Sequence, residues 1–109
     1  MAYYLYMGAY TAEAWAALAK TPQNRMETVR PVAQALGGDL EQAWLSFGEY
    51  DMVALLRLPD NASAAAFAVA VAAGGAMKAG KTVPLLTLEE GVEVMRRAGT
   101  AGYRPPTGG

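Results

Sequence analysis

Residues 48–51, Gly-Glu-Tyr-Asp, constrain the fold of this chain most, because they separate two runs with the character of β-strands. The run before them spans residues 40–47, and the run after them spans residues 52–58. Glycine and aspartate tolerate the backbone conformations of turns better than bulkier residues do. The segment therefore predicts a β-hairpin in the middle of the fold.

Length and composition indicate one globular domain. At 109 residues, with 53% apolar and 17% charged residues, the chain can bury its own hydrophobic core. Its net charge is −1 and it has no run of like charges, so it lacks the electrostatic footprint of a nucleic-acid-binding protein. We expect no targeting leader, and no apolar stretch is long enough to cross a membrane. We expect a cytoplasmic protein without nucleic-acid or membrane partners.

The absence of cysteine and histidine removes several chemistries. Disulfides, thiol nucleophiles, imidazole bases and zinc or haem sites with Cys or His ligands are excluded. A magnesium or calcium site would need several converging carboxylates. The candidates are scattered along the chain: Asp39, Glu41, Glu49, Asp51 and Asp60. We therefore expect neither a metal nor another cofactor.

The first part of the chain predicts a strand followed by helices. Alternating, tyrosine-rich residues 2–10 favour a strand, and residues 11–20 favour a helix that Thr11 caps. A second helix is predicted to start at the Thr-Pro pair of residues 21–22 and to stop at the glycines of residues 37–38. Pro31 lies inside this helix and is expected to kink or interrupt it.

The second part repeats the pattern. An alanine-rich helix is predicted over residues 62–73, and a strand over residues 81–87. Pro84 places this strand at a sheet edge, because a central strand needs the N–H group that proline lacks. Residues 87–90 form a capping box that opens a final helix ending near Ala98.

The predicted order assigns the chain to the α+β class, as a ferredoxin-like split βαβ fold (βαββαβ plus a C-terminal helix). This fold has a four-stranded antiparallel sheet with helices on one face. We expect a single domain over residues 1–99 and a Gly/Pro-rich tail over residues 100–109.

Several short motifs occur together in a recognisable order. They are Gly48, Tyr50 and Asp51 of the hairpin, the tyrosine-rich first strand, Arg25, Ala35-Leu36-Gly37-Gly38 and Pro59-Asp60. In these features the chain resembles the GYD domain family over residues 2–98. The resemblance implies a ferredoxin-like fold of the dimeric α/β-barrel type, in which two sheets face each other. The family has no established activity, and related barrels include monooxygenases, enzymes that decompose small acids and ligand-sensing domains of regulators.

Residues 75–82 match the phosphate-binding pattern G-x-x-x-x-G-K-[ST]. That loop requires a strand before it and a helix after it, so that N–H groups point at phosphate. Here the predicted order is reversed, with a helix before the pattern and a strand after it. We interpret the segment as a flexible connection, in which Lys78 and Lys81 could still attract an anion.

Period-two alternation divides the side chains of the first two strands between two faces. The helix-free face is predicted to carry Tyr4, Tyr6, Tyr10, Gln42, Trp44 and Ser46, and the helix-facing core Leu5, Met7, Leu45 and Phe47. An aromatic sheet face should not be left in water, so we expect a second copy to cover it. The two sheets would either pack together directly or enclose a cavity for a small molecule.

The expected ligand-binding residues are Tyr4, Tyr6, Tyr10, Arg25, Trp44 and Ser46. Arg25 is included because its guanidinium can hold a ligand carboxylate through two hydrogen bonds. The sequence identifies no catalytic residue, and Tyr6 and Asp51 are only weak candidates. Glu49 and Asp51 could act as acid and base, but such residues more often stabilise a turn.

Two functions follow from these observations. The first is a homo-oligomeric module that binds a small apolar or aromatic molecule between facing sheets, or that is purely structural. The alternative is a cofactor-free enzyme, monooxygenase-like or isomerase/lyase-like, acting on a small aromatic or phenolic substrate. Tyr6, Trp44 or Asp51 would then supply hydrogen bonds or proton transfer, although the missing histidine argues against it. RNA binding on the sheet is disfavoured by the charge.

Overall fold

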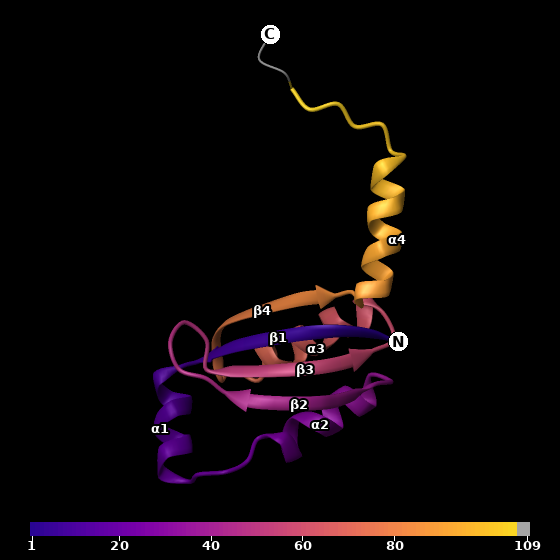
Figure 1. Ribbon diagram of the computed structural model, residues 1–109. Coiled ribbons are helices and arrows are strands. Elements are labelled where there is room, and N and C mark those ends of the chain that lie inside the picture. Colours follow the sequence, from indigo (N-terminus) through magenta and orange to yellow (C-terminus); the bar gives the residue numbers. More distant parts are fainter. Residues whose placement is uncertain (107–109) are drawn as a thin grey trace.

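The computed structural model describes residues 1–106 and contains four strands and four helices (Figure 1). In chain order they are β1 (Ala2–Tyr10), α1 (Ala12–Lys20), α2 (Met26–Ala35), β2 (Asp39–Leu45), β3 (Met52–Leu58), α3 (Asn61–Ala73), β4 (Met77–Leu85) and α4 (Leu88–Gly99). The strands form one antiparallel sheet in the order β2-β3-β1-β4. The α+β architecture is consistent with the predicted ferredoxin-like fold.

The hairpin and the edge strand are confirmed. β2 and β3 pair on either side of a short connection that Ser46 and Asp51 close, with the Ser46 N–H donating to the Asp51 carbonyl at 2.7 Å. β4 pairs only with β1, so it lies at the sheet edge that Pro84 requires.

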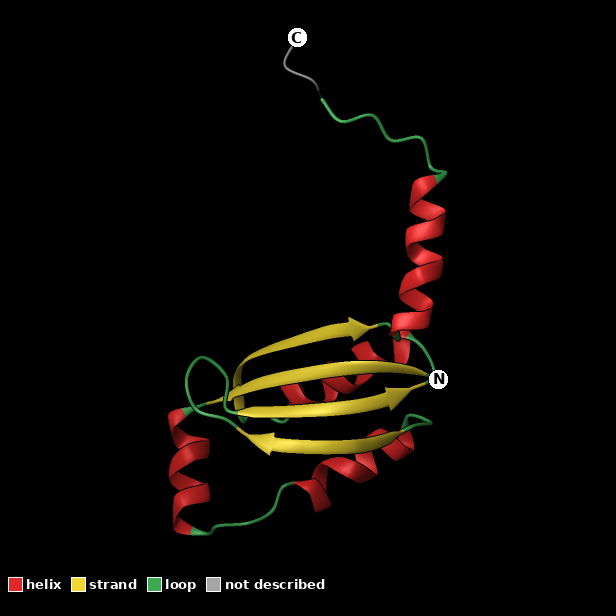
Figure 2. Cartoon of the chain, in the orientation of Figure 1, coloured by secondary structure: helices red, strands yellow, loops and turns green. Residues whose placement is uncertain are grey.

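Helices α2 and α3 cover one face of the sheet and leave the other face bare (Figures 1 and 2). The core lies between this helical layer and the sheet. Its largest fully buried side chains are Phe67, Leu40, Leu56 and Leu58. Helix α1 stands at one end of the sheet, beyond β1, and α4 points away from the sheet at the other end (Figure 1).

The tyrosines of β1 were assigned to the wrong face. Tyr4, Tyr6 and Tyr10 are buried in the core on the helical side, whereas Leu5 and Met7 alternate onto the bare face. The Tyr4 hydroxyl donates to Asn61 Oδ1 of α3 at 2.7 Å. Helix α3 is built mainly from alanine, so the opposing strand must fill the space between them with large side chains.

The assignment of β2 was half right. Trp44 pairs with Val53 and so lies on the bare face, as predicted. Leu45 pairs with Met52 on the helical side, but it is 72% exposed, and Phe47 lies beyond the strand and is 95% exposed. The prediction that these two residues belong to the core was therefore wrong. The helical layer therefore leaves the C-terminal end of β2 uncovered.

Two boundaries also differ from the prediction. Helix α2 begins at Met26, where Asn24 Oδ1 accepts the Met26 N–H at 3.0 Å, and it continues through Pro31 without interruption. Strand β4 begins at Met77, so most of residues 75–82 lie in a strand and not in a flexible connection. Their backbone N–H groups belong to a sheet ladder, which leaves no phosphate-binding loop.

Thr87 caps α4 through the predicted capping box. No residue of α4 is buried, and the chain beyond it extends further from the sheet (Figure 1). Tyr103 is 80% exposed. Of the tail predicted over residues 100–109, the last three residues lie outside the described part of the chain.

Candidate functional site

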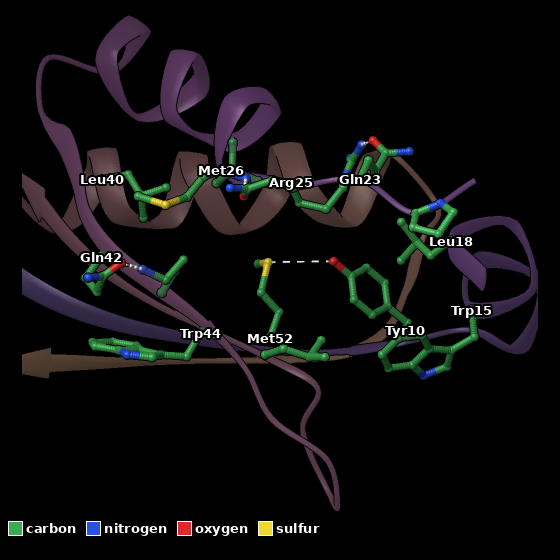
Figure 3. Close-up of a pocket in the computed structure, with 16 residues that line it drawn as sticks. Tyr10, Trp15, Leu18, Gln23, Arg25, Met26, Leu40, Gln42, Trp44 and Met52 are labelled. Atoms are coloured by element: carbon green, nitrogen blue, oxygen red, sulfur yellow. Dashed lines mark hydrogen bonds between the residues drawn. The ribbon is translucent and has the colours of Figure 1, made fainter. Parts of the chain in front are cut away.

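A cleft of about 490 Å³ opens between the sheet and the segment that joins α1 to α2 (Figure 3). We call it the helix-side cleft. Its lining residues are Tyr10, Trp15, Leu18, Pro22, Gln23, Asn24, Arg25, Met26, Val29, Leu40, Gln42, Ala43, Trp44, Leu45, Met52 and Ala54. Carbon-rich side chains dominate this lining, so the cleft suits a largely apolar molecule.

Tyr10 and Met52 rise from the sheet into the cleft (Figure 3). The Tyr10 hydroxyl lies 3.8 Å from Met52 Sδ, a weak acceptor. Trp15 packs edge-on against the Tyr10 ring, with 5.1 Å between the ring centroids. These three side chains give one end of the cleft an aromatic wall with a single hydroxyl group.

Arg25 supplies the only formal charge among the residues that line the cleft. Its Nη1 donates to Gln23 Oε1 at 2.8 Å, and the residue is partly buried. Among residues 1–106, Arg25 takes part in no ion pair. A guanidinium with a neutral partner retains hydrogen-bonding capacity for an anion.

Burial raises the pKa of Tyr10 above its ordinary value, and the Asp51 carboxylate adds to this effect. The positive charge of Arg25 and a hydrogen bond from its side chain act in the opposite direction, but the net direction of the pKa shift is upward. Tyr10 is therefore protonated at neutral pH and serves the cleft as a hydrogen-bond donor.

A model of the GYD domain family matches residues 4–95. The chain belongs to the GYD domain family. No curated protein matches this GYD domain in sequence.

Solved structures share the fold of this GYD domain at low sequence identity. The crystal structure of TTHA0845 from Thermus thermophilus is 15% identical, with a TM-score of 0.53, covering 80% of this chain and 95% of the other. FFRP-DM1 is 13% identical, with a TM-score of 0.52 and coverage of 79% and 100%. The hypothetical protein PHS023 from Pyrococcus horikoshii is 12% identical, with a TM-score of 0.51 and coverage of 80% and 92%. At these identities the likeness concerns the fold alone.

The GYD domain brings together three of the six residues expected to bind a ligand. Tyr10, Arg25 and Trp44 all line the helix-side cleft, although Trp44 does so from the outer edge of β2, where the register places it on the bare face. Tyr4 lies under α3, and the Ser46 hydroxyl donates to the Tyr50 carbonyl at 2.8 Å within the hairpin connection. The cleft is on the helical side of the sheet, whereas the sequence interpretation placed a cavity between facing sheets.

The two weak catalytic candidates, Tyr6 and Asp51, lie outside the helix-side cleft. Tyr6 packs edge-on against Phe67 with 5.5 Å between ring centroids, and burial raises its pKa. The buried Asp51 accepts the Tyr10 N–H through Oδ2 at 2.9 Å, while its own N–H donates to the Gly8 carbonyl at 2.9 Å. Asp51 thus joins the hairpin connection to β1.

Sequence reasoning missed Trp15 and Met52 as lining residues. A tryptophan in an alanine-rich helix is a usable signal, because a large ring among small side chains marks the side of α1 that makes contact. Met52 had no such signal, since a methionine in a strand is ordinarily a core residue.

Within residues 1–106, no group of three His, Cys, Asp or Glu side chains is close enough to hold a metal ion. None of the helices described there is long and apolar enough to span a membrane.

Proposed function

We propose that this GYD domain is a homodimeric binding module whose ligand is a small aromatic or apolar carboxylate. The ligand occupies the helix-side cleft. The observation that carries the proposal is the position of Arg25, which brings one partly buried positive charge to a cleft with otherwise neutral lining. A partly desolvated charge gains most from an ionic partner, and a carboxylate matches the two-pronged geometry of guanidinium.

The rest of the lining supports the same class of ligand. The volume of about 490 Å³ lies within the usual range for small-molecule sites. Trp15 and Tyr10 provide the aromatic wall, and the Tyr10 hydroxyl provides a donor. A ring that lies against this wall could direct its carboxylate toward Arg25.

Binding is favoured over proton-transfer catalysis. The lining residues include no Asp or Glu, and the raised pKa of Tyr10 makes its hydroxyl a poor base at neutral pH. The cofactor-free enzyme is therefore the weaker interpretation of this cleft.

The dimer in this proposal forms through the bare sheet face. Register places a set of apolar side chains on that face: Leu5, Met7, Val53, Leu55, Val83 and Leu85. These side chains remain partly exposed in the single chain. Burying two such faces against each other would remove both from water. The interface would be separate from the ligand, because the helix-side cleft lies on the other side of the sheet.

Benzoate and its neutral isostere benzamide test the ligand class. Trp15 lies in the wall of the helix-side cleft, so intrinsic fluorescence can follow binding. We expect benzoate to bind about tenfold or more tightly than benzamide, the range expected for a hydrogen bond to a charged group. Arg25→Gln should abolish this preference while leaving benzamide binding nearly unchanged.

Arg30→Gln is the matched control for this experiment. Arg30 lies on α2, the helix that begins directly after Arg25, but it pairs with Asp39 at 3.5 Å and does not line the helix-side cleft. It should keep the preference for benzoate. Equal affinities for the two probes in the natural sequence, or an unchanged preference in Arg25→Gln, would contradict the proposal.

A further inference from the structure

Helix α4 carries an apolar stripe that no other part of residues 1–106 buries. Leu88 is 91% exposed, Met95 67% and Val92 48%. The helix points away from the sheet (Figures 1 and 2), and none of its residues is buried. A helix of 12 residues is marginal in water on its own, so it requires a packing partner to be stable.

The stripe has the spacing of a helix-pairing seam. Leu88, Val92, Met95 and Gly99 follow one another at intervals of four, three and four residues. This is the spacing of the a and d core positions of a coiled coil, which lie together on one side of the helix. The apolar side of α4 therefore suits another helix lying alongside it.

The charges beside the seam indicate which helix that is. Glu89 and Arg96 are one heptad apart, so they flank the same side of the seam. If a second α4 runs antiparallel, with Val92 opposite Met95, then Glu89 of each chain faces Arg96 of the other. In a parallel pair, each of these e positions would instead meet a g position of the other helix, and the g positions of α4 are the uncharged Gly91 and Ala98, so neither charge would gain a partner.

We propose that α4 pairs antiparallel with α4 of a second copy of this chain, about a two-fold axis. Such an interface is self-complementary, because every contact occurs twice. In the single chain, Arg96 forms an ion pair with Glu93 of the same helix at 2.8 Å, and both side chains are largely exposed. Exposed pairs of this kind contribute little, so redirecting Arg96 to the other chain costs little. This pairing does not depend on the ligand of the helix-side cleft or on the bare sheet face.

Disulfide trapping tests the pairing directly, because the chain has no cysteine of its own. Val92→Cys and Met95→Cys variants, one of them carrying a mass tag, are mixed in a glutathione redox buffer. We expect the mixed disulfide to form faster than either symmetric one, since the antiparallel register sets position 92 opposite position 95. Val94→Cys lies off the seam and should cross-link only slowly with any of the variants.

A charge exchange in the same mixture provides the second test. Glu89→Arg and Arg96→Glu should each slow mixed-disulfide formation about fivefold or more, and the double variant should restore the rate. Arg97→Glu is the matched control. This variant also loses an ion pair with Glu93, which Arg97 forms at 3.4 Å. Because Arg97 lies away from the seam, the rate of mixed-disulfide formation should not change.

Three results would overturn the proposal. They are a predominance of symmetric disulfides, a mixed disulfide no faster than the Val94→Cys products, and a double variant as slow as the single ones. Circular dichroism of each variant checks that α4 stays helical. Arg96→Glu leaves the capping box of the first turn intact and carries the test if Glu89→Arg unwinds that turn.

Discussion

Individual residues of this chain gain their roles from neighbours that are distant in sequence. Asp51 was only a weak catalytic candidate in the sequence, where a role in stabilising the turn was favoured, and its oxygen accepts the N–H of Tyr10. Arg25 and Tyr10 were selected for their chemistry, and both line the helix-side cleft. The kind of side chain was therefore predictable in part, whereas its partner was not, since partners depend on how β1 and the hairpin come together.

Replacing Asp51 should destabilise the fold. Asp51→Ala removes a buried acceptor and leaves the Tyr10 N–H without its partner, which costs about 1–3 kcal/mol of unfolding free energy. Urea denaturation measures the change. Glu49→Ala is the control, because Glu49 is exposed in the same connection and should shift stability by less than about 0.5 kcal/mol. Equal effects of the two substitutions would refute the structural role of Asp51.

At the scale of elements, two helix caps were predicted correctly, whereas the helix start at residues 21–22 and the face assigned to the β1 tyrosines were wrong. The caps at Thr11 and Thr87 were predicted correctly because a cap depends on three or four consecutive residues. Alternation along β1 was also correct, but alternation alone does not say which face meets the helices. The volume left by the alanines of α3 decides this, and Tyr4 and Tyr6 fill it. That Trp15 lines the helix-side cleft depends on how α1 packs against the end of the sheet, and the pattern of residues along α1 does not predict this packing.

The N-cap of α3 should give stability a defined pH dependence. The backbone N–H and the hydroxyl of Ser63 donate to Asp60 and lower its pKa below the ordinary value of 3.8. A lowered pKa in the folded state means that the ionised cap stabilises the fold above the unfolded pKa. This contribution is lost as the pH falls through the folded pKa.

Asp60→Asn tests this dependence, because asparagine can cap a helix but does not titrate. The difference in melting temperature between the natural chain and Asp60→Asn should be constant from about pH 5 to 8 and should shrink below about pH 4. A difference that stays constant down to about pH 2 would show that the ionisation of Asp60 does not stabilise α3.

At the scale of the whole molecule, residues 1–106 leave at least two apolar surfaces uncovered in the single chain. One is the bare sheet face and the other is the stripe of α4. They lie on different parts of the fold, so each can be tested by its own variants. The sequence predicted that the sheet face would need a second copy, but it could not show that α4 stands clear of the domain.

Leu55→Lys should weaken the dimer proposed for the bare sheet face. Leu55 pairs with Leu5 near the middle of that face and is partly exposed, so a lysine can reach solvent in the single chain but not in the dimer. We expect the dissociation constant of the dimer, measured by sedimentation, to rise by more than about tenfold. Val69→Lys, on the exposed side of α3, should leave association unchanged. Unaltered association in Leu55→Lys would exclude the sheet face as the interface.

The central claim is that Arg25 holds a small carboxylate in the helix-side cleft of a dimer. Native mass spectrometry of gently purified protein tests it most directly, since one spectrum reports both assembly and retained ligand. We predict an assembly of at least two chains carrying the mass of a small acid, and an Arg25→Gln assembly without that mass. A monomer, a dimer that retains no added mass, or a mass retained equally by Arg25→Gln would contradict the account.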